Sequence, residues 1–285
     1  MKTKNIFIVD KQQLNEKIKK FKQDGISKIH IVSDFDRTLT RFEVNGEKVN
    51  SVISILRDEN YLTPDYSDRA KALFNKYHSF EIDFTIPWEE RKAKMLEWWS
   101  THYDVLKECG LTKSDLESIV NSNRILFRNG YDEFFKLSGD NNIPITIITA
   151  NGLGGDIIKL VLKRFNVKSD DINLVANEII WDEKGKFIDI KKPIIHVLNK
   201  DEVIIKDEKI HNSIKDRNNV ILLGDTEGDI GMVEHIKYDS IIKVGYLNEK
   251  ETELMEKYCE IFDIVIINDG GLEVVNKILK QIITK

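Results

Sequence analysis

A series of short, β-branched apolar runs, separated by helix-like stretches, constrains the fold of this chain more than any other feature. We expect six buried strands, at Lys28–Ser33, Ile143–Ile148, Ile172–Ala176, Asn219–Leu223, Ser240–Val244 and Asp263–Ile267. Apolar strands that alternate with helices form a parallel sheet that is covered on both faces. The sequence therefore predicts an α/β protein with a Rossmann-like, mostly parallel sheet at its core.

Two insertions interrupt this alternation. Between the first two strands, helical periodicity recurs at Asp65–His78, Trp88–Leu106 and Lys113–Leu126. Because a crossover needs only a dozen or so residues, we expect a separate helical cap over residues 43–128, with an α/β core made of residues 1–42 and 129–285. A later stretch, Glu178–Asp189, has the pattern of a β-hairpin with its turn at Lys184-Gly185.

Composition and charge exclude several classes of protein. The 285 residues are 41% hydrophobic and 32% charged, with a net charge of −5, as in ordinary soluble proteins. The chain has no apolar run near the ~18 residues of a membrane span, no signal-peptide core, and no basic tract suited to a nucleic acid polymer. We therefore expect a cytoplasmic protein with neither a membrane nor a nucleic acid partner. Its oligomeric state stays open, with a monomer as one option.

Two carboxylates directly follow the first strand. Asp34 lies at the carboxyl end of that strand, where ligands bind in open parallel sheets, and Asp36 is the next residue to face the same way. One carboxylate can attack phosphorus to form an aspartyl phosphate, and a second can protonate the leaving oxygen and then activate water. The alternative is an acidic loop that only caps a helix.

A second acidic cluster, Gly224-Asp225 to Asp229, follows another apolar strand. If the two strands are neighbours, Asp225 and Asp229 lie near Asp34. Several carboxylates in one crevice repel one another unless a cation neutralises them. Mg²⁺ suits such a site because it is held by few carboxylates and also accepts phosphate oxygens.

Two further features are weaker when taken singly. Thr149 begins a turn, Thr149–Gly152, that offers a hydroxyl and backbone N–H groups to a phosphate, although such turns are common. Lys200 is one lysine among many, and most surface lysines are simply solvated. It becomes a candidate because phosphoryl transfer needs a cation near the equatorial oxygens.

In order, these residues resemble the four motifs of the haloacid dehalogenase superfamily of phosphohydrolases. Several segments further resemble the cytosolic pyrimidine 5′-nucleotidases of class III: Ser33–Phe42, Phe80–Asp83, Glu97–Trp99, Ile194–Lys200, Leu222–Asp229, Val244–Asn248 and Phe262–Val265. The resemblance covers most of the chain from about residue 28 onward. It implies Mg²⁺-dependent hydrolysis of nucleoside 5′-monophosphates, with pyrimidine nucleotides such as CMP and UMP as the expected substrates.

The resemblance also implies a role for each residue of the acidic loops. Asp34 would be the nucleophile and Asp36 the general acid and base. Asp34, Asp225 and the backbone carbonyl of Asp36 would hold Mg²⁺. Asp229 and Thr38 would support these ligands without binding the ion.

The resemblance assigns the remaining contacts to phosphate and nucleoside. The phosphoryl group would be held by Thr149, Ala150 and Lys200, and the nucleoside by Glu81, Trp99 and His102. Two positions depart from the family: it usually has Ser-Ala-Gly where this chain has Thr149-Ala150-Asn151, and a substrate-binding serine where this chain has His102. These departures leave the base preference open.

Two other functions fit the same residues. One is hydrolysis of another small phosphomonoester, such as a sugar phosphate. The other is a non-catalytic nucleotide-binding or phosphorelay protein, which would need neither Asp36 as an acid nor a cap of this size.

Overall fold

The centre of the protein is a seven-stranded sheet with the order β1-β11-β10-β9-β2-β5-β6. The computed structural model describes residues 5–83, 85–168, 172–200, 208–234 and 237–284. The strands are β1 (Ile6–Ile8), β2 (Ile29–Ser33), β5 (Ile145–Ile148), β6 (Ile172–Val175), β9 (Asn219–Gly224), β10 (Ser240–Tyr246) and β11 (Ile264–Ile266). All neighbours are parallel except β1, which pairs antiparallel with β11. The predicted mostly parallel sheet is therefore confirmed, and β1 was missed.

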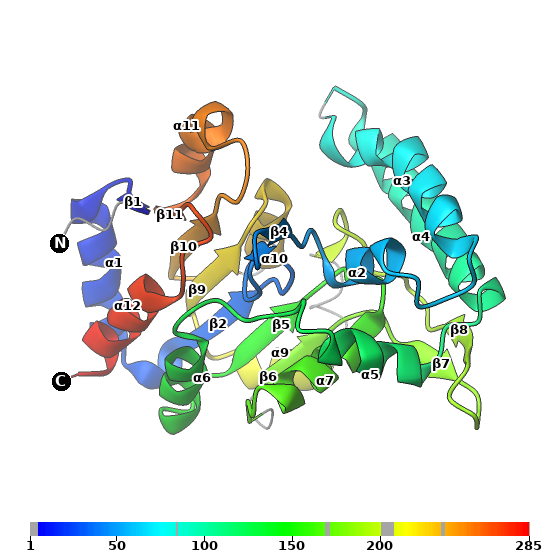
Figure 1. The fold of residues 1–285 in the computed structure, drawn as a ribbon. Coiled ribbons are helices and arrows are strands. Elements are labelled where there is room, and N and C mark those ends of the chain that lie inside the picture. Colours follow the sequence, from blue (N-terminus) through cyan, green and yellow to red (C-terminus); the bar gives the residue numbers. More distant parts are fainter. Residues whose placement is uncertain (1–4, 84, 169–171, 201–207, 235–236, 285) are drawn as a thin grey trace.

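Helices cover both faces of this sheet (Figure 1). Successive side chains of a strand point to opposite faces, so Ile29 and Ile31 pack into one cluster and Val32 into another. The first cluster includes residues of α1 (Lys11–Asp24), α6 (Tyr131–Asp140), α7 (Gly154–Arg164) and α12 (Glu273–Ile283). The other face is covered by α9 (Glu208–Ile214), α10 (Gly231–Glu234) and α11 (Glu251–Ile261). Burial on both faces explains why the central strands are mostly apolar.

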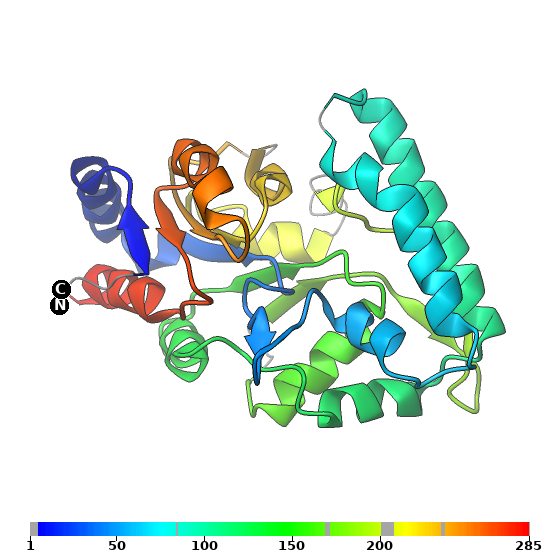
Figure 2. The same cartoon turned by 45° about the horizontal axis from the view of Figure 1, so that its top comes forward.

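The insert between β2 and β5 is mainly helical, as predicted. It contains the short strands β3 (Glu43–Val44) and β4 (Glu47–Lys48) and the helices α2 (Val52–Asp58), α3 (Tyr66–Ile82), α4 (Trp88–Glu108) and α5 (Lys113–Asn121). Helices α3 and α4 lie side by side beyond the carboxyl ends of the sheet strands, whereas α5 packs beside α7 of the core (Figures 1 and 2). The chain segments at the two ends of the insert lie side by side, because the backbone N–H of Arg41 donates to the carbonyl of Leu126 over 2.8 Å.

Some predicted boundaries differ from the structure. The helix expected to reach Leu126 ends at Asn121, because Asn123 takes the left-handed conformation, with φ of 62°, and leads the chain out of the helix. The predicted hairpin is present as β7 (Ile179–Trp181) and β8 (Phe187–Ile190), with Gly185 in its turn at φ of 77°. Among the described residues, no helix combines the length and apolarity that crossing a bilayer requires.

Candidate active site

The carboxyl ends of three neighbouring strands bring the predicted polar residues together. Because β2 lies between β9 and β5, the residues that follow these strands, Asp34, Asp225 and Thr149, meet at one edge of the sheet. They border a cavity of about 520 Å³, which Asp36 and Lys200 also line. This volume lies within the range of small-molecule sites.

Lys200 joins two of the carboxylates. Its Nζ lies 2.6 Å from Oδ1 of Asp34 and 2.9 Å from Oδ1 of Asp229, and all three side chains are buried. Burial by itself lowers the pKa of Lys200. The two carboxylates together raise this pKa by more than burial lowers it, so the lysine stays charged. Burial raises the pKa of Asp34, the charges of Asp229 and Asp225 raise it again, and Lys200 opposes them. The site therefore has more negative charge than Lys200 alone can balance.

Asp229 holds the loop that carries Asp225. Its Oδ2 accepts hydrogen bonds from the backbone N–H groups of Asp225 and Thr226, over 3.0 and 2.9 Å, and from the Thr226 hydroxyl over 3.0 Å. A Cβ atom at Gly224 would lie 2.5 Å from that of Asp229, so only glycine allows this close approach. Asp229 thus fixes both the Asp225 loop and the Lys200 ammonium group.

Asp36 is held from two sides. Its Oδ1 accepts the backbone N–H of Val52, at the start of α2, over 2.9 Å, and its Oδ2 accepts the side-chain amide of Asn151 over 2.6 Å. Burial raises the pKa of the Asp36 carboxyl, and these two hydrogen bonds oppose the rise. The insert and the loop after β5 therefore both orient this side chain.

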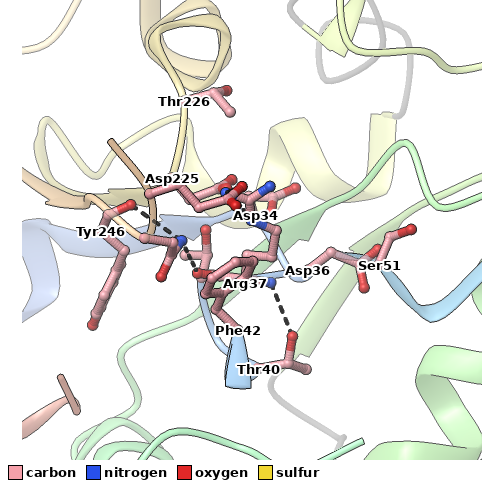
Figure 3. A network of polar contacts seen from close by, with 12 residues as sticks. Asp34, Asp36, Arg37, Thr40, Phe42, Ser51, Asp225, Thr226 and Tyr246 are labelled. Carbon is pink, nitrogen blue, oxygen red and sulfur yellow. Dashed lines mark hydrogen bonds and ion pairs between the residues drawn. The ribbon is translucent and has the colours of Figure 1, made fainter. Parts of the chain in front are cut away.

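Arg37 is a residue of the site that sequence reasoning missed. Its guanidinium lies beside Asp225 (Figure 3), with Nε 3.2 Å from Oδ2 of that residue. Its Nη2 lies 3.5 Å from Oε2 of Glu249. It also stacks over the ring of Phe42 at 4.8 Å. Burial raises the pKa of Asp225 to about 6, and Arg37 is the largest opposing influence. No sequence signal identifies it beyond its position next to Asp36.

Arg128 was also missed, because a lone arginine outside any motif carries no signal. Its side chain is fully buried, and its guanidinium donates to the carbonyls of Thr38 over 2.8 Å, Arg37 over 2.5 Å and Gly270 over 2.7 Å. It thereby holds the loop that follows Asp36. The Thr38 hydroxyl, expected to support the metal ligands, is buried without a hydrogen-bond partner among the residues that the structure describes.

The insert contributes three predicted residues to the same cavity, Trp99, His102 and Glu81. The rings of Trp99 and His102 stack with centroids 5.7 Å apart, and Nε2 of His102 lies 3.1 Å from the hydroxyl of Tyr66. Glu81 lies 3.2 Å from Nδ1 of His78. The loop after β5 lies against this wall, because a side chain at Gly152 would collide with the Trp99 ring.

His102 gives a prediction on the pH dependence of stability. Burial, helped by the charge of Arg57, lowers its pKa from 6.5 to about 4. As the pH falls from 6.5 towards 4, the unfolded chain therefore binds a proton that the folded protein does not, and up to about 3 kcal/mol of stability is lost. The stability advantage of the wild type over His102→Asn should shrink by that order between pH 7 and pH 4, as measured by urea unfolding. A pH-independent difference would contradict the prediction.

The acidic cluster offers a donor set for a divalent cation. Asp34 and Asp225 supply two carboxylates, and Asp36, which lines the same cavity, has a backbone carbonyl as a further oxygen donor. Within the described part of the chain, no group of three or more His, Cys, Asp or Glu side chains is arranged around a common metal position. Mg²⁺ commonly takes only one or two carboxylates and completes its shell with water and phosphate, so two carboxylates and a carbonyl fit it.

Comparison with known proteins identifies the family of this chain. Residues 37–283 match the family model described as Pyrimidine 5′-nucleotidase (UMPH-1). The chain is 35% identical, over 277 residues, to a 7-methylguanosine phosphate-specific 5′-nucleotidase of Xenopus laevis; the match covers 97% of this chain and 95% of that protein.

Solved structures agree with this match. A crystal structure of cytosolic 5′-nucleotidase IIIB bound to cytidine superposes with a TM-score of 0.86 and 26% identity, covering 99% of this chain and 94% of that one. A HAD family hydrolase of Salmonella enterica shares the fold, with a TM-score of 0.57 and 18% identity over 89% of this chain and 71% of its own. The chain is therefore an enzyme, a phosphoric monoester hydrolase, and it belongs to the pyrimidine 5′-nucleotidase (UMPH-1) family.

Proposed function

We propose that this enzyme hydrolyses nucleoside 5′-monophosphates to nucleoside and phosphate, with Mg²⁺ as cofactor and an aspartyl phosphate as intermediate. The observation that carries the proposal is the convergence of Asp34, Asp36, Lys200 and Asp225 on one cavity that also has an aromatic wall. The acidic groups suit a cation that would bind together with the phosphate, and the indole and imidazole rings of the same cavity suit a nucleotide base.

In this proposal, Asp34 attacks phosphorus while Asp36 acts as the acid. As the bond from Asp34 to phosphorus forms, the bond to the 5′ oxygen breaks, and that oxygen keeps the electron pair and takes the proton of Asp36. Water then gives a proton to Asp36 and attacks phosphorus, which releases phosphate and returns the electron pair to Asp34. Asp36 thus ends each cycle protonated, as it began.

The phosphoryl oxygens need positive charge and hydrogen-bond donors. Lys200 supplies a buried ammonium group, and Thr149 and Ala150 are proposed to supply a hydroxyl and a backbone N–H. The hydroxyl oxygen of Thr149 already accepts the N–H of Asn151 over 3.1 Å, which leaves its proton to be donated. A bound Mg²⁺ would supply further charge neutralisation, held by Asp34, Asp225 and the Asp36 carbonyl with Asp229 behind them.

We propose that residues 43–128 are the substrate-recognition cap and that residues 1–42 and 129–285 are the core. The antiparallel hydrogen bonds between the two ends of the insert support these boundaries, because the chain leaves and re-enters the core at one place. Trp99 would stack on the base, and His102 and Glu81 would bind its polar edge. Stacking on an indole is worth roughly 1–3 kcal/mol and tolerates different bases.

Two bases are candidates. The first candidate is a pyrimidine, because the family model is described as a pyrimidine 5′-nucleotidase. The second is 7-methylguanine, because similar proteins are named as specific for 7-methylguanosine phosphate. A specific observation favours the second candidate, since a cationic base gains from both the Trp99 face and the Glu81 carboxylate, which line one cavity. We propose a cytoplasmic enzyme, because two of the similar proteins are named as cytosolic 5′-nucleotidases. Its partner would be the nucleoside monophosphate substrate.

The decisive experiment measures phosphate release from CMP, UMP, GMP, 7-methyl-GMP and a sugar phosphate, with Mg²⁺ and with EDTA. We expect turnover of nucleotides that EDTA abolishes and added Mg²⁺ restores, because the acidic cluster needs a cation to accept a phosphate dianion. Higher kcat/KM with the sugar phosphate would contradict a nucleotide substrate. Activity that survives EDTA would contradict the cofactor.

A further inference from the structure

We propose that Asn151 is the positioning residue for Asp36: its side-chain amide holds the Asp36 carboxyl in the orientation that delivers a proton to the leaving 5′ oxygen. The inference rests on the proposed function, because it requires Asp36 to be the acid. It gives a role to the Asn151 side chain, which the proposed mechanism does not otherwise use.

Each oxygen of the Asp36 carboxyl accepts one fixed donor. The Asn151 amide lies 2.6 Å from Oδ2, and the Val52 N–H lies 2.9 Å from Oδ1. Two donors on opposite oxygens fix the plane of the carboxyl group, and each oxygen keeps a lone pair for the proton or the substrate. Asp36 lines the cavity together with Asp34, so the carboxyl that is fixed in this way belongs to the proposed site of reaction.

The orientation of the Asn151 amide is itself determined. Its Oδ1 accepts the backbone N–H of Leu153 over 2.8 Å, so the NH₂ group must face Asp36 and can only donate to it. Asn151 is 4% exposed, which leaves water little access to take the place of its side chain. Its backbone N–H also donates to Thr149, so one residue orients both the acid and the hydroxyl proposed to bind phosphate.

Asn151 lies where the core loop meets the insert. The next residue, Gly152, packs so closely under Trp99 and Ile53 that a side chain there would collide with both. The second donor to Asp36 comes from Val52, which directly precedes Ile53. The orientation of the acid therefore depends on the loop after β5 and on the wall of the nucleoside site together.

The proton of Asp36 matters only for a poor leaving group. When the bond from phosphorus to a nucleoside 5′ oxygen breaks, the departing alkoxide needs that proton. The 4-nitrophenolate ion leaves without one, since its charge is delocalised over the ring. A misoriented acid should therefore slow the nucleotide and spare 4-nitrophenyl phosphate, which a general structural defect would not do.

The test compares kcat/KM for a nucleotide and for 4-nitrophenyl phosphate in the wild type, Asn151→Ser and Asp36→Asn. The kcat/KM ratio reports the steps up to departure of the leaving group, so the later attack of water does not enter. Serine keeps a short acceptor for the Leu153 N–H but is too short to replace the amide at Asp36. With Asn151→Ser we expect a fall of about 10- to 100-fold for the nucleotide and a much smaller fall for the aryl ester.

Two further variants make the result decisive. Asn151→Thr also offers the Leu153 N–H a short acceptor and has no donor that reaches Asp36, so it should show the same selective loss even if the serine variant folds poorly. Asn177→Ala is the matched control, because Asn177 is equally buried and its amide bonds to the backbone of Ile195, away from Asp36. It should affect both substrates equally.

The outcomes separate the inference from the function on which it rests. Equal losses for both substrates in the Asn151 variants, with a selective loss in Asp36→Asn, would overturn the role of Asn151 alone. If Asp36→Asn itself showed no selectivity, the proposed acid would be wrong and the inference would fall with it.

Discussion

Replacing Asp34 by asparagine is expected to lower kcat with nucleotides by about 10⁴-fold or more, because an amide of the same shape cannot attack phosphorus. The variant also removes one of the two negative charges beside Lys200, whose Nζ lies 2.6 Å from the Asp34 carboxylate. The measurement is phosphate release from CMP and 7-methyl-GMP, joined with mass spectrometry of the quenched enzyme. The wild type should carry a phosphoryl group on the peptide that contains Asp34, and the variant should not.

A loss of activity is informative only if the protein stays folded. Burial already disfavours the charged form of Asp34, so a neutral amide should be tolerated, and circular dichroism should show a cooperative unfolding transition like that of the wild type. Asp156→Asn is a suitable control, since Asp156 lies in the first turn of α7 and bonds to Trp181 and Lys159. Near-normal turnover by Asp34→Asn with any nucleotide would refute the assignment of the nucleophile.

Replacing Lys200 by methionine should remove both activity and stability. Lys200 is the shared partner of the buried Asp34 and Asp229, and breaking a buried ion pair from one side typically costs about 3–5 kcal/mol. We expect a loss of that order in the free energy of unfolding at pH 7, measured in urea without divalent cations. Lowering the pH should reduce this loss of unfolding free energy, because protonation of the Asp34 carboxylate removes a charge that has lost its partner.

Lys48 provides the matched control for this variant. Its Nζ lies 2.7 Å from Glu249 at the same cavity, but its side chain is 63% exposed. Exposed pairs contribute less than about 1 kcal/mol, so Lys48→Met should leave the free energy of unfolding almost unchanged. A similarly small change in Lys200→Met would mean that Asp34 and Asp229 do not depend on this lysine.

The acidic part of the site could be predicted from sequence because strand ends in a parallel sheet have predictable neighbours. Asp34, Thr149 and Asp225 each follow an apolar strand, and the strand order places those ends side by side. Lys200 could be proposed only through the chemistry of phosphoryl transfer and through family resemblance, since 166 residues separate it from Asp34. Its hydrogen bonds to both Asp34 and Asp229 required the folded chain.

Other residues of the site could not be identified from the sequence. Arg37 and Arg128 look like ordinary arginines, yet one lies against Asp225 and the other is fully buried behind the loop that follows Asp36. Asn151 could be noticed as a departure from the family, but its contact with Asp36 could not be read from a spacing of 115 residues. Helix α2, seven residues long, was missed because so short an element gives little periodicity.

The parallel sheet, the helices of the insert and the loops with acidic side chains could be read from local patterns, since apolar periodicity and strand-end position are local properties of a chain. Folding of the whole chain sets which charged side chains meet, which cation lies beside which carboxylate and how Asp36 is oriented. Those contacts join segments far apart along the chain, and their energies depend on burial and on distances of a few ångströms, which no local pattern encodes.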